Sequence, residues 1–117
     1  AEFIARETRP DEPIFVGCTS HRRVIWNDLN LYYVARRLGA TRYMQFDPGT
    51  ITSERGQSEM IADLERSQPR IALLAPDCWG PEPNISQVLG ASRLDTYLAQ
   101  HYAPDGSIGT FSILRRR

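Results

Sequence analysis

Short apolar runs alternate with segments of helical periodicity along most of this chain. Two runs, Pro13–Cys18 and Ile71–Ala75, are rich in aliphatic and β-branched residues and short enough to be buried strands. Weaker candidates are Arg42–Phe46, which ends at the turn residues Asp47-Pro48-Gly49, and Ser107–Leu114, which we expect to be a strand or a tight hairpin. The pattern therefore predicts four to five strands.

Three helices are expected in the intervals between these runs. The first covers residues 28–38 and the second residues 53–68, each starting at a polar N-cap and stopping before a helix breaker. The third starts at Ser92, where Asp95 three residues later completes an acidic capping box, and it stops before Pro104-Asp105-Gly106. Each helix carries apolar residues at helical spacing, so each is expected to pack on the sheet.

This alternation predicts a small layered α/β domain over residues 13–117. Right-handed crossovers would make the sheet mostly parallel, with four to five strands and three helices, and the last strand is free to run antiparallel. Residues 1–12 mix charged residues with Phe3 and Ile4 as apolar anchors, which is typical of a linker or a loosely docked arm. A domain that begins in this way is expected to be a fragment of a longer protein.

Composition narrows the classes of function. The 117 residues are 41% hydrophobic and 24% charged, and 14 basic residues balance 14 acidic ones, which argues against binding to nucleic acid. All 14 basic residues are arginine, so chemistry that needs a lysine Schiff base or a P-loop lysine is excluded. No glycine-rich phosphate loop follows a strand, and no His, Cys or acidic residues recur at metal-ligand spacing. We therefore expect neither a cofactor nor a metal.

Polar loops are expected to converge at the carboxyl-terminal edge of the parallel strands, where open α/β sheets place their ligands. The candidate contact residues for a sugar or an acceptor are Asn27, Asp28, Asp47, Asp77, Trp79 and Asn84. Trp79 would supply an apolar stacking face beside polar partners. Asn27 and Asp28 also suit helix capping, so both roles stay open for them.

Three further features carry candidate chemistry. Cys18 and Cys78 follow the ends of two predicted strands, and a disulfide between them is open if those strands are neighbours. His21 with Asp77 is the pair that a small hydrolase would use, although capping and solvent contacts are the commoner role of a loop histidine. The closing run Arg115-Arg116-Arg117 is typical of a solvated tail, with contact to a membrane surface as the alternative.

Several short motifs, taken in their order along the chain, resemble one family. They are Pro13-Ile14-Phe15-Val16-Gly17, Val24-Ile25-Trp26-Asn27-Asp28, Thr41-Arg42-Tyr43, Asp47-Pro48-Gly49, Leu64-Glu65-Arg66, Glu82-Pro83-Asn84, Leu94-Asp95, Tyr102 and Leu114-Arg115-Arg116. In this order they resemble the extracytoplasmic C-terminal domain of bacterial multi-pass membrane glycosyltransferases related to the protein mannosyltransferases. The resemblance covers residues 13–116.

The resemblance implies an accessory role. Such proteins use a polyprenyl-phosphate sugar donor, and their essential acidic residues lie near the first membrane helix, so the resemblance implies no catalytic residue in this chain. The expected function is a non-catalytic domain on the extracytoplasmic side of the bacterial cell membrane, in contact with the transmembrane part of its parent chain. Both cysteines depart from the family pattern and fit an oxidising compartment, which favours the disulfide. A free-standing small α/β hydrolase and a protein-interaction module are the alternatives.

Overall fold

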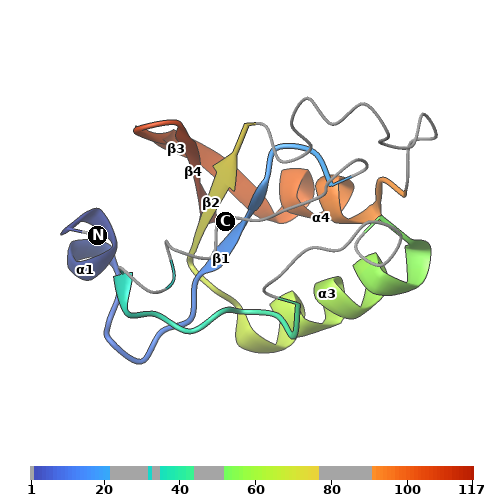
Figure 1. Cartoon of the computed structure of the whole chain (residues 1–117), viewed down its shortest axis with the longest axis horizontal. Helices are drawn as coiled ribbons and strands as arrows, with labels where there is room; N and C mark the ends of the chain where they lie inside the picture. Colours follow the sequence, from blue (N-terminus) through green and yellow to red (C-terminus); the bar gives the residue numbers. More distant parts are fainter. Residues whose placement is uncertain (1, 22–31, 33–34, 44–51, 77–90) are drawn as a thin grey trace, which may run out of the picture.

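The chain forms a four-stranded mixed sheet with helices on both faces (Figure 1). This computed structural model describes residues 2–21, 32, 35–43, 52–76 and 91–117. In chain order, its elements are α1 (Glu2–Glu7), β1 (Phe15–Cys18), α3 (Glu54–Ser67), β2 (Ile71–Ala75), α4 (Arg93–His101), β3 (Tyr102–Ile108) and β4 (Phe111–Arg116). The strand order across the sheet is β1-β2-β4-β3.

The sheet is mixed, and the expectation of a mostly parallel sheet is wrong. Among these strands only β1 and β2 pair in parallel, with Phe15 opposite Ala72, whereas β4 runs antiparallel to both β2 and β3. The reason lies after Ile108, where the chain turns back as a hairpin and β4 enters the sheet between β2 and β3. An antiparallel neighbour needs only such a short turn, whereas a parallel neighbour needs a crossover connection. The small α/β class and the antiparallel last strand are confirmed.

The outer edge of β1 pairs with a short stretch of chain rather than with a full strand. Ile14 forms an isolated parallel bridge with Gly39, in which Ile14 N donates to Leu38 O and Ala40 N donates to Ile14 O, both at 3.0 Å. Of the strand expected over residues 42–46, the first two residues lie outside any strand and residues 44–46 lie outside the described residues. The described part of the chain therefore holds four strands.

A buried tyrosine covers the next position along this edge. The Tyr32 hydroxyl accepts a hydrogen bond from Val16 N at 2.8 Å and lies 3.4 Å from Val16 O, to which it donates. Tyr32 is 4% exposed, and burial raises the pKa of its hydroxyl to about 12. A side chain thus satisfies backbone groups that a neighbouring strand would otherwise have paired.

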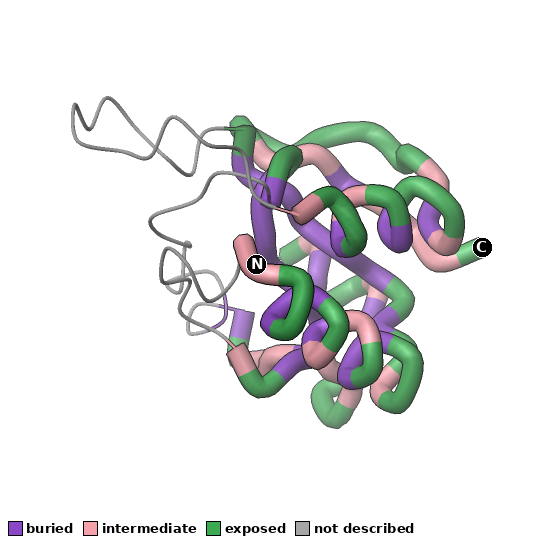
Figure 2. Tube along the Cα trace, turned by 90° about the vertical axis from the view of Figure 1, so that its right-hand side faces the viewer, coloured by how far each residue is buried: buried purple, intermediate pink, exposed green. Residues whose placement is uncertain are grey.

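Two hydrophobic clusters lie on the two faces of the sheet. One joins the sheet to α3 and α4 and includes Phe15, Ala72, Leu74, Met60, Leu64, Leu94, Tyr97 and Leu98. The other joins it to α1 and to the segment after β1 and includes Ile14, Val16, Ile71, Leu73, Ile113, Ile4, Tyr32 and Ala35. Figure 2 shows these buried stretches running through the interior of the molecule. Because both faces are covered, every residue of β2 is buried, which explains its uninterrupted apolar sequence.

The amino-terminal segment, for which the sequence favours a linker or an arm, contains a helix that packs on the domain. Ile4 of α1 is 2% exposed within the second cluster. Arg37 holds the residue after the helix, because its Nε donates to Thr8 Oγ1 at 2.9 Å and its Nη2 to Thr8 O at 3.2 Å. These contacts give residues 2–8 a fixed place against the sheet.

The second predicted helix is confirmed at both ends. The Ser53 hydroxyl caps α3 by accepting from Gly56 N at 2.9 Å. Gln68 ends the helix in the left-handed region, at a φ of 46°, and its N–H donates to Leu64 O. Of the first predicted helix, residues 32 and 35 are helical and residues 36–38 are not, so its predicted end is wrong. Residues 28–31, 33 and 34 lie outside the described residues.

The third predicted helix is confirmed with Ser92 as its N-cap residue, but the predicted capping box and the predicted helix breaker are wrong. Ser92 makes no side-chain capping bond within the described part of the chain, and the carboxylate of Asp95 binds His21 instead of closing a capping box. Pro104-Asp105-Gly106 lies inside β3 rather than ending α4. Proline is tolerated there because β3 is an edge strand. The predicted hairpin forms between β3 and β4 and turns at Gly109, whose φ is 56°.

Candidate functional site

The carboxyl ends of β1 and β2 lie side by side, as the sequence predicts. Thr19 N donates to Ala75 O at 2.9 Å, and the Thr19 hydroxyl donates to Pro76 O at 3.3 Å. Residues 22–31 and 77–90, which carry most of the candidate site residues, begin just beyond these positions. Their starting points are therefore neighbours at one edge of the sheet.

Gln57 of α3 joins three parts of the chain at this edge. Its Nε2 donates to His21 O and to Ala91 O, each at 2.9 Å, and its Oε1 accepts from Leu94 N at 3.0 Å. Gln57 is fully buried. These contacts use both N–H donors of its side-chain amide and one acceptor position of its oxygen. Ala91 N in turn donates to Thr52 O at 2.8 Å. We call Gln57 and these four partner residues the Gln57 junction.

The Gln57 junction gathers residues that flank all three polar segments. His21 precedes residues 22–31, Thr52 follows residues 44–51, and Ala91 follows residues 77–90. Each of these flanking residues takes part in the hydrogen bonds just described. The Gln57 amide therefore holds the flanks of residues 22–31 and 77–90, and Ala91 N joins the flank of residues 44–51 to them.

His21 is the second buried polar residue at this edge, and its ring bridges β1 and α4. Its Nε2 accepts from Cys18 N at 2.9 Å, so the proton of the neutral ring sits on Nδ1, which donates to Asp95 Oδ1 at 2.8 Å. The backbone N–H of His21 also contacts both oxygens of this carboxylate at 3.0 Å. Asp95 therefore fixes the tautomer and the orientation of the ring.

Gly17 makes room for this ring. A Cβ at Gly17 would lie 2.7 Å from His21 Nε2 and 2.7 Å from a ring carbon of Phe15. Real side chains do not approach so closely, so only glycine at this position leaves room for both rings, whose centroids lie 6.0 Å apart. The strand, the histidine and the aromatic ring form one packed unit.

The His21 geometry favours a structural role over the hydrolase alternative. The side chain is 0% exposed, and both of its ring nitrogens are already hydrogen-bonded. A general base needs a nitrogen that can reach a substrate or water. Asp77, the partner that the sequence suggests for such a role, lies outside the described residues; the described partner of the ring is Asp95.

The remaining candidate residues fall in segments that the structure does not describe. They are Asn27, Asp28, Asp47, Asp77, Trp79, Asn84 and Cys78. Cys18 is described and buried at the end of β1, with 1% exposure. The contacts of the six polar or aromatic candidates and the Cys18–Cys78 disulfide therefore stay predictions.

Gln57 and Asp95 are the site residues that sequence reasoning missed. Gln57 falls three and seven residues before Met60 and Leu64, so a polar side chain occupies the apolar stripe of α3. That position was the available signal, because a buried amide must find hydrogen-bond partners. Asp95 had been assigned to a local capping box, which hid its long-range contact with His21.

The buried carboxylate of Asp63 anchors the chain that leads into residues 44–51. Asp63 Oδ2 accepts from Arg42 N at 2.8 Å and from Arg42 Nε at 3.0 Å, and Oδ1 accepts from Arg42 Nη2 at 3.0 Å and from Arg66 Nη2 at 2.6 Å. Hydrogen bonds from Arg42 are the largest cause that lowers the pKa of Asp63 to about 2. This network ties residues 42 and 43 to α3.

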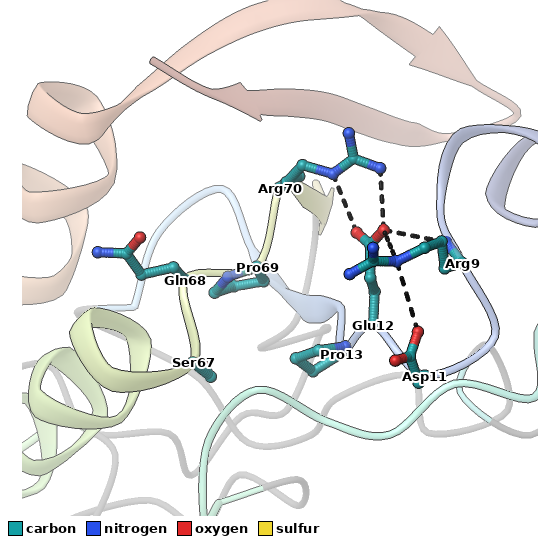
Figure 3. A pocket seen from close by; sticks show the side chains of 8 residues that line it. All are labelled: Arg9, Asp11, Glu12, Pro13, Ser67, Gln68, Pro69 and Arg70. Atoms are coloured by element: carbon teal, nitrogen blue, oxygen red, sulfur yellow. Dashed lines mark hydrogen bonds and ion pairs between the residues drawn. The ribbon is translucent and has the colours of Figure 1, made fainter.

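A polar pocket of about 560 Å³ lies where β1 and β2 begin, at the end of these strands opposite the Gln57 junction (Figure 3). Glu12 occupies its middle, where it accepts from Arg70 Nε at 2.9 Å and from Arg70 Nη2 at 3.0 Å, and Arg9 lies on its other side with Nε 3.3 Å from Glu12 Oε1. The hydrogen bonds from Arg70 lower the pKa of the Glu12 carboxyl. Asp11 balances the second guanidinium, so the charges of this pocket cancel. Its ion pairs hold the chain before β1 against the start of β2.

The closing arginines are not a solvated tail. Arg115 Nε donates to Asp105 Oδ2 at 2.9 Å, and Arg116 is 17% exposed, with its guanidinium 5.5 Å from the centre of the Tyr102 ring. The prediction is wrong for these two residues because both lie in β4. Their side chains connect the hairpin to neighbouring elements.

Among residues 2–21, 32, 35–43, 52–76 and 91–117, no group of three or more His, Cys, Asp or Glu side chains is placed to hold a metal ion. Nor does this part of the chain contain a helix with the length and hydropathy of a membrane span. Comparison with protein-family models, with curated proteins and with solved structures finds no match.

Proposed function

We propose that this chain is a non-catalytic extracytoplasmic domain of a membrane glycosyltransferase-like protein, and that polar segments at the carboxyl edge of β1 and β2 contact a sugar or an acceptor. The family and the cellular location rest on the order of motifs along the sequence. The contact surface rests on the structure around the Gln57 junction. Both parts have their own test.

The observation that carries the contact surface is the convergence of chain ends at the Gln57 junction. One buried amide binds His21 O, Ala91 O and Leu94 N, and Ala91 N binds Thr52 O. In α/β folds, binding loops connect the ends of β-strands to the starts of helices, and these rigid elements hold the loops in place. The segments anchored here carry two indoles, amides and carboxylates, which are the groups that bind the apolar faces and hydroxyls of sugars.

The state of His21 supports a binding role rather than an enzymatic one. Both ring nitrogens are hydrogen-bonded, Nε2 to Cys18 N and Nδ1 to Asp95 Oδ1, and the side chain is buried. A side chain held in this way organises the loop that follows β1 and is not placed to exchange protons with a ligand. We therefore assign His21 a structural role, in which it connects β1 to α4.

Amide chemical-shift mapping by NMR with a panel of methyl glycosides tests the contact surface. We expect saturable shifts at the amides that flank the three segments, namely Thr19, His21, Thr52 and Ala91. Trp79→Ala should weaken the binding by about fivefold or more, because it removes the stacking face. Thr96→Ala, at an exposed position of α4, is the control and should leave the titration unchanged.

Absence of any shift at these four amides up to about 50 mM glycoside would reject the sugar contact, since even weak carbohydrate sites bind in the millimolar range. Equal binding by Trp79→Ala and the unsubstituted chain would reject the role of Trp79. Turnover of a panel of ester and phosphoester substrates that is lost in His21→Asn would overturn the non-catalytic assignment.

The reading frame that encodes the chain tests the membrane assignment. A parent protein with several hydrophobic spans of about 20 residues would support it. A frame that encodes only this domain would contradict it and would favour a free-standing protein.

A further inference from the structure

A mainly apolar pocket of about 310 Å³ opens between α4 and the sheet, on the face opposite α1. Its walls come from the ends of β1 and β2, from the β3–β4 hairpin and from one side of α4. The lining residues are Cys18, Thr19, Leu74, Asp95, Leu98, Ala99, Tyr102, Pro104, Leu114 and Arg117. Of these described lining residues, Cys18 is the one that the sequence also marks as a candidate.

The apolar walls set the size of the occupant. Leu74, Leu98 and Leu114 line the pocket with aliphatic carbon, and the Tyr102 hydroxyl is turned away because it donates to Pro69 O. An apolar cavity of about 150 Å³ holds one benzene molecule. A pocket of twice that volume suits one six-membered ring with a short substituent.

One polar end of the pocket is the carboxylate of Asp95. This side chain is 26% exposed and makes three contacts with His21, of which two fall on Oδ1 and one on Oδ2. A carboxylate offers about four acceptor positions, so Oδ2 can accept one more hydrogen bond. A hydroxyl or an amine of a ligand fits this place.

Arg117 is the second charged residue of the described lining. Its backbone N donates to His101 O at 2.9 Å, which fixes the residue beside the last turn of α4. Nearly every other arginine side chain in the described residues has an ion pair or a hydrogen bond, but Arg117 has none there. Asp95 lies six residues before His101, which is about 9 Å along a helix axis.

We propose that this pocket binds a small organic anion with a ring-sized apolar body, whose anionic group pairs with Arg117 and whose opposite end donates a hydrogen bond to Asp95. The charges at the two ends are complementary to such a ligand, and the apolar walls between them exclude ligands that are polar throughout. The pocket adjoins the proposed sugar contact at Thr19 and Asp95, but binding in it does not depend on that contact.

The probe is para-hydroxyphenylpropanoate, in which a phenol and a carboxylate flank one ring. We expect saturable amide shifts at Leu98, Ala99 and Leu114 in NMR titrations of the complete chain. Phenylpropanoate lacks the hydroxyl, and para-hydroxyphenylpropanol lacks the charge. Each should bind about three- to tenfold more weakly, because each loses one polar contact.

Two variants locate the probe. Ala99→Leu places a larger side chain at the rim of the pocket and should abolish the shifts, whereas Gln100→Leu, at the next exposed position of α4, should leave them unchanged. Arg117→Gln should weaken the binding of the acid about tenfold and leave the affinity for the alcohol unchanged. Thermal unfolding of each variant shows whether it is folded.

Three results would overturn the proposal. They are no saturable shift of the lining amides up to about 20 mM probe, equal affinity for the acid and the alcohol, and unchanged binding by a folded Ala99→Leu variant. Shifts caused by the methyl glycosides at Thr52 and Ala91 would be a separate result, so failure of one site is distinguishable from failure of the other.

Discussion

The charge of Asp63 contributes to stability in a defined range of pH. The side chain is 1% exposed and its pKa falls from 3.8 to about 2 on folding, mainly through hydrogen bonds from Arg42. Because the folded value lies below the unfolded one, the stabilisation is fully present above about pH 4 and is lost as the pH falls through about 2. The difference corresponds to about 2 kcal/mol.

Urea unfolding between pH 2 and pH 6, in steps of about half a pH unit, measures this contribution. Asp63→Asn should lower the free energy of unfolding at neutral pH by about 3 kcal/mol, since it leaves two guanidinium groups facing a neutral amide. The variant should also lose less stability than the unsubstituted chain on acidification. Asp105→Asn is the control, because Asp105 pairs with Arg115 at an exposed position and should change stability by less than about 1 kcal/mol. Parallel acid curves for Asp63→Asn and the unsubstituted chain would contradict this account.

Tyr32 gives a second prediction at the scale of one residue. Tyr32→Phe removes the buried hydroxyl that accepts from Val16 N and donates to Val16 O. We expect a loss of about 2 kcal/mol in the free energy of unfolding, measured by urea titration. Tyr43→Phe removes a hydroxyl whose partner is Glu59 at 3.3 Å on a partly buried surface, and it should cost less than about 0.5 kcal/mol. Equal losses in the two variants would show that the β1 edge does not depend on this hydroxyl.

At the scale of the elements, two serines in N-cap positions should behave differently. The Ser53 hydroxyl accepts from Gly56 N, so Ser53→Ala should destabilise the protein by about 1 kcal/mol. Ser92 makes no capping bond within the described residues, and Ser92→Ala should change the free energy of unfolding by less than about 0.3 kcal/mol. Chemical denaturation of both variants measures the difference. A larger loss for Ser92→Ala than for Ser53→Ala would mean that the two caps have been assigned the wrong way round.

The elements that the sequence predicts correctly are those whose signals are local. Residues 71–75 are apolar without interruption and form β2, and the Ser53 cap with the Pro69 stop bounds α3 within one residue. The start of α4 is different, because Leu94 N is satisfied by Gln57 from another helix. A capping hydrogen bond to a residue 37 positions away cannot be predicted from the local sequence. Local pattern therefore found the helix but assigned it the wrong cap.

At the scale of the whole molecule, local patterns predict part of the sheet topology and of the candidate site, and long-range contacts determine the rest. The alternation of elements predicts the α/β class and the shared edge of β1 and β2, and both are present. The direction of the last strand depends on the turn after Ile108, where the chain reverses and β4 enters the sheet between β2 and β3. The sequence pattern suggested Asp77 as the partner of His21, whereas in the fold Asp95 binds it, since a contact across 74 residues is set by packing.

Gln57 is where these long-range contacts meet, so its removal should affect the whole molecule. Gln57→Leu keeps the shape of the side chain and leaves His21 O, Ala91 O and Leu94 N without their described partner. We expect a loss of about 3 kcal/mol in the free energy of unfolding.

Hydrogen exchange by NMR separates global from local effects of this change. The amides of Leu94 and Asp95 in α4 and of His21 should lose more protection than those of β2, because the junction holds the first turn of α4 and the end of the β1 loop. Gln100→Leu, exposed on α4, is the matched control and should leave stability and exchange unchanged. If Gln57→Leu lowered protection uniformly across α4, β2 and β4, the junction would be an ordinary part of the core. A loss confined to the flanks of the three polar segments would instead mark it as the anchor that positions them.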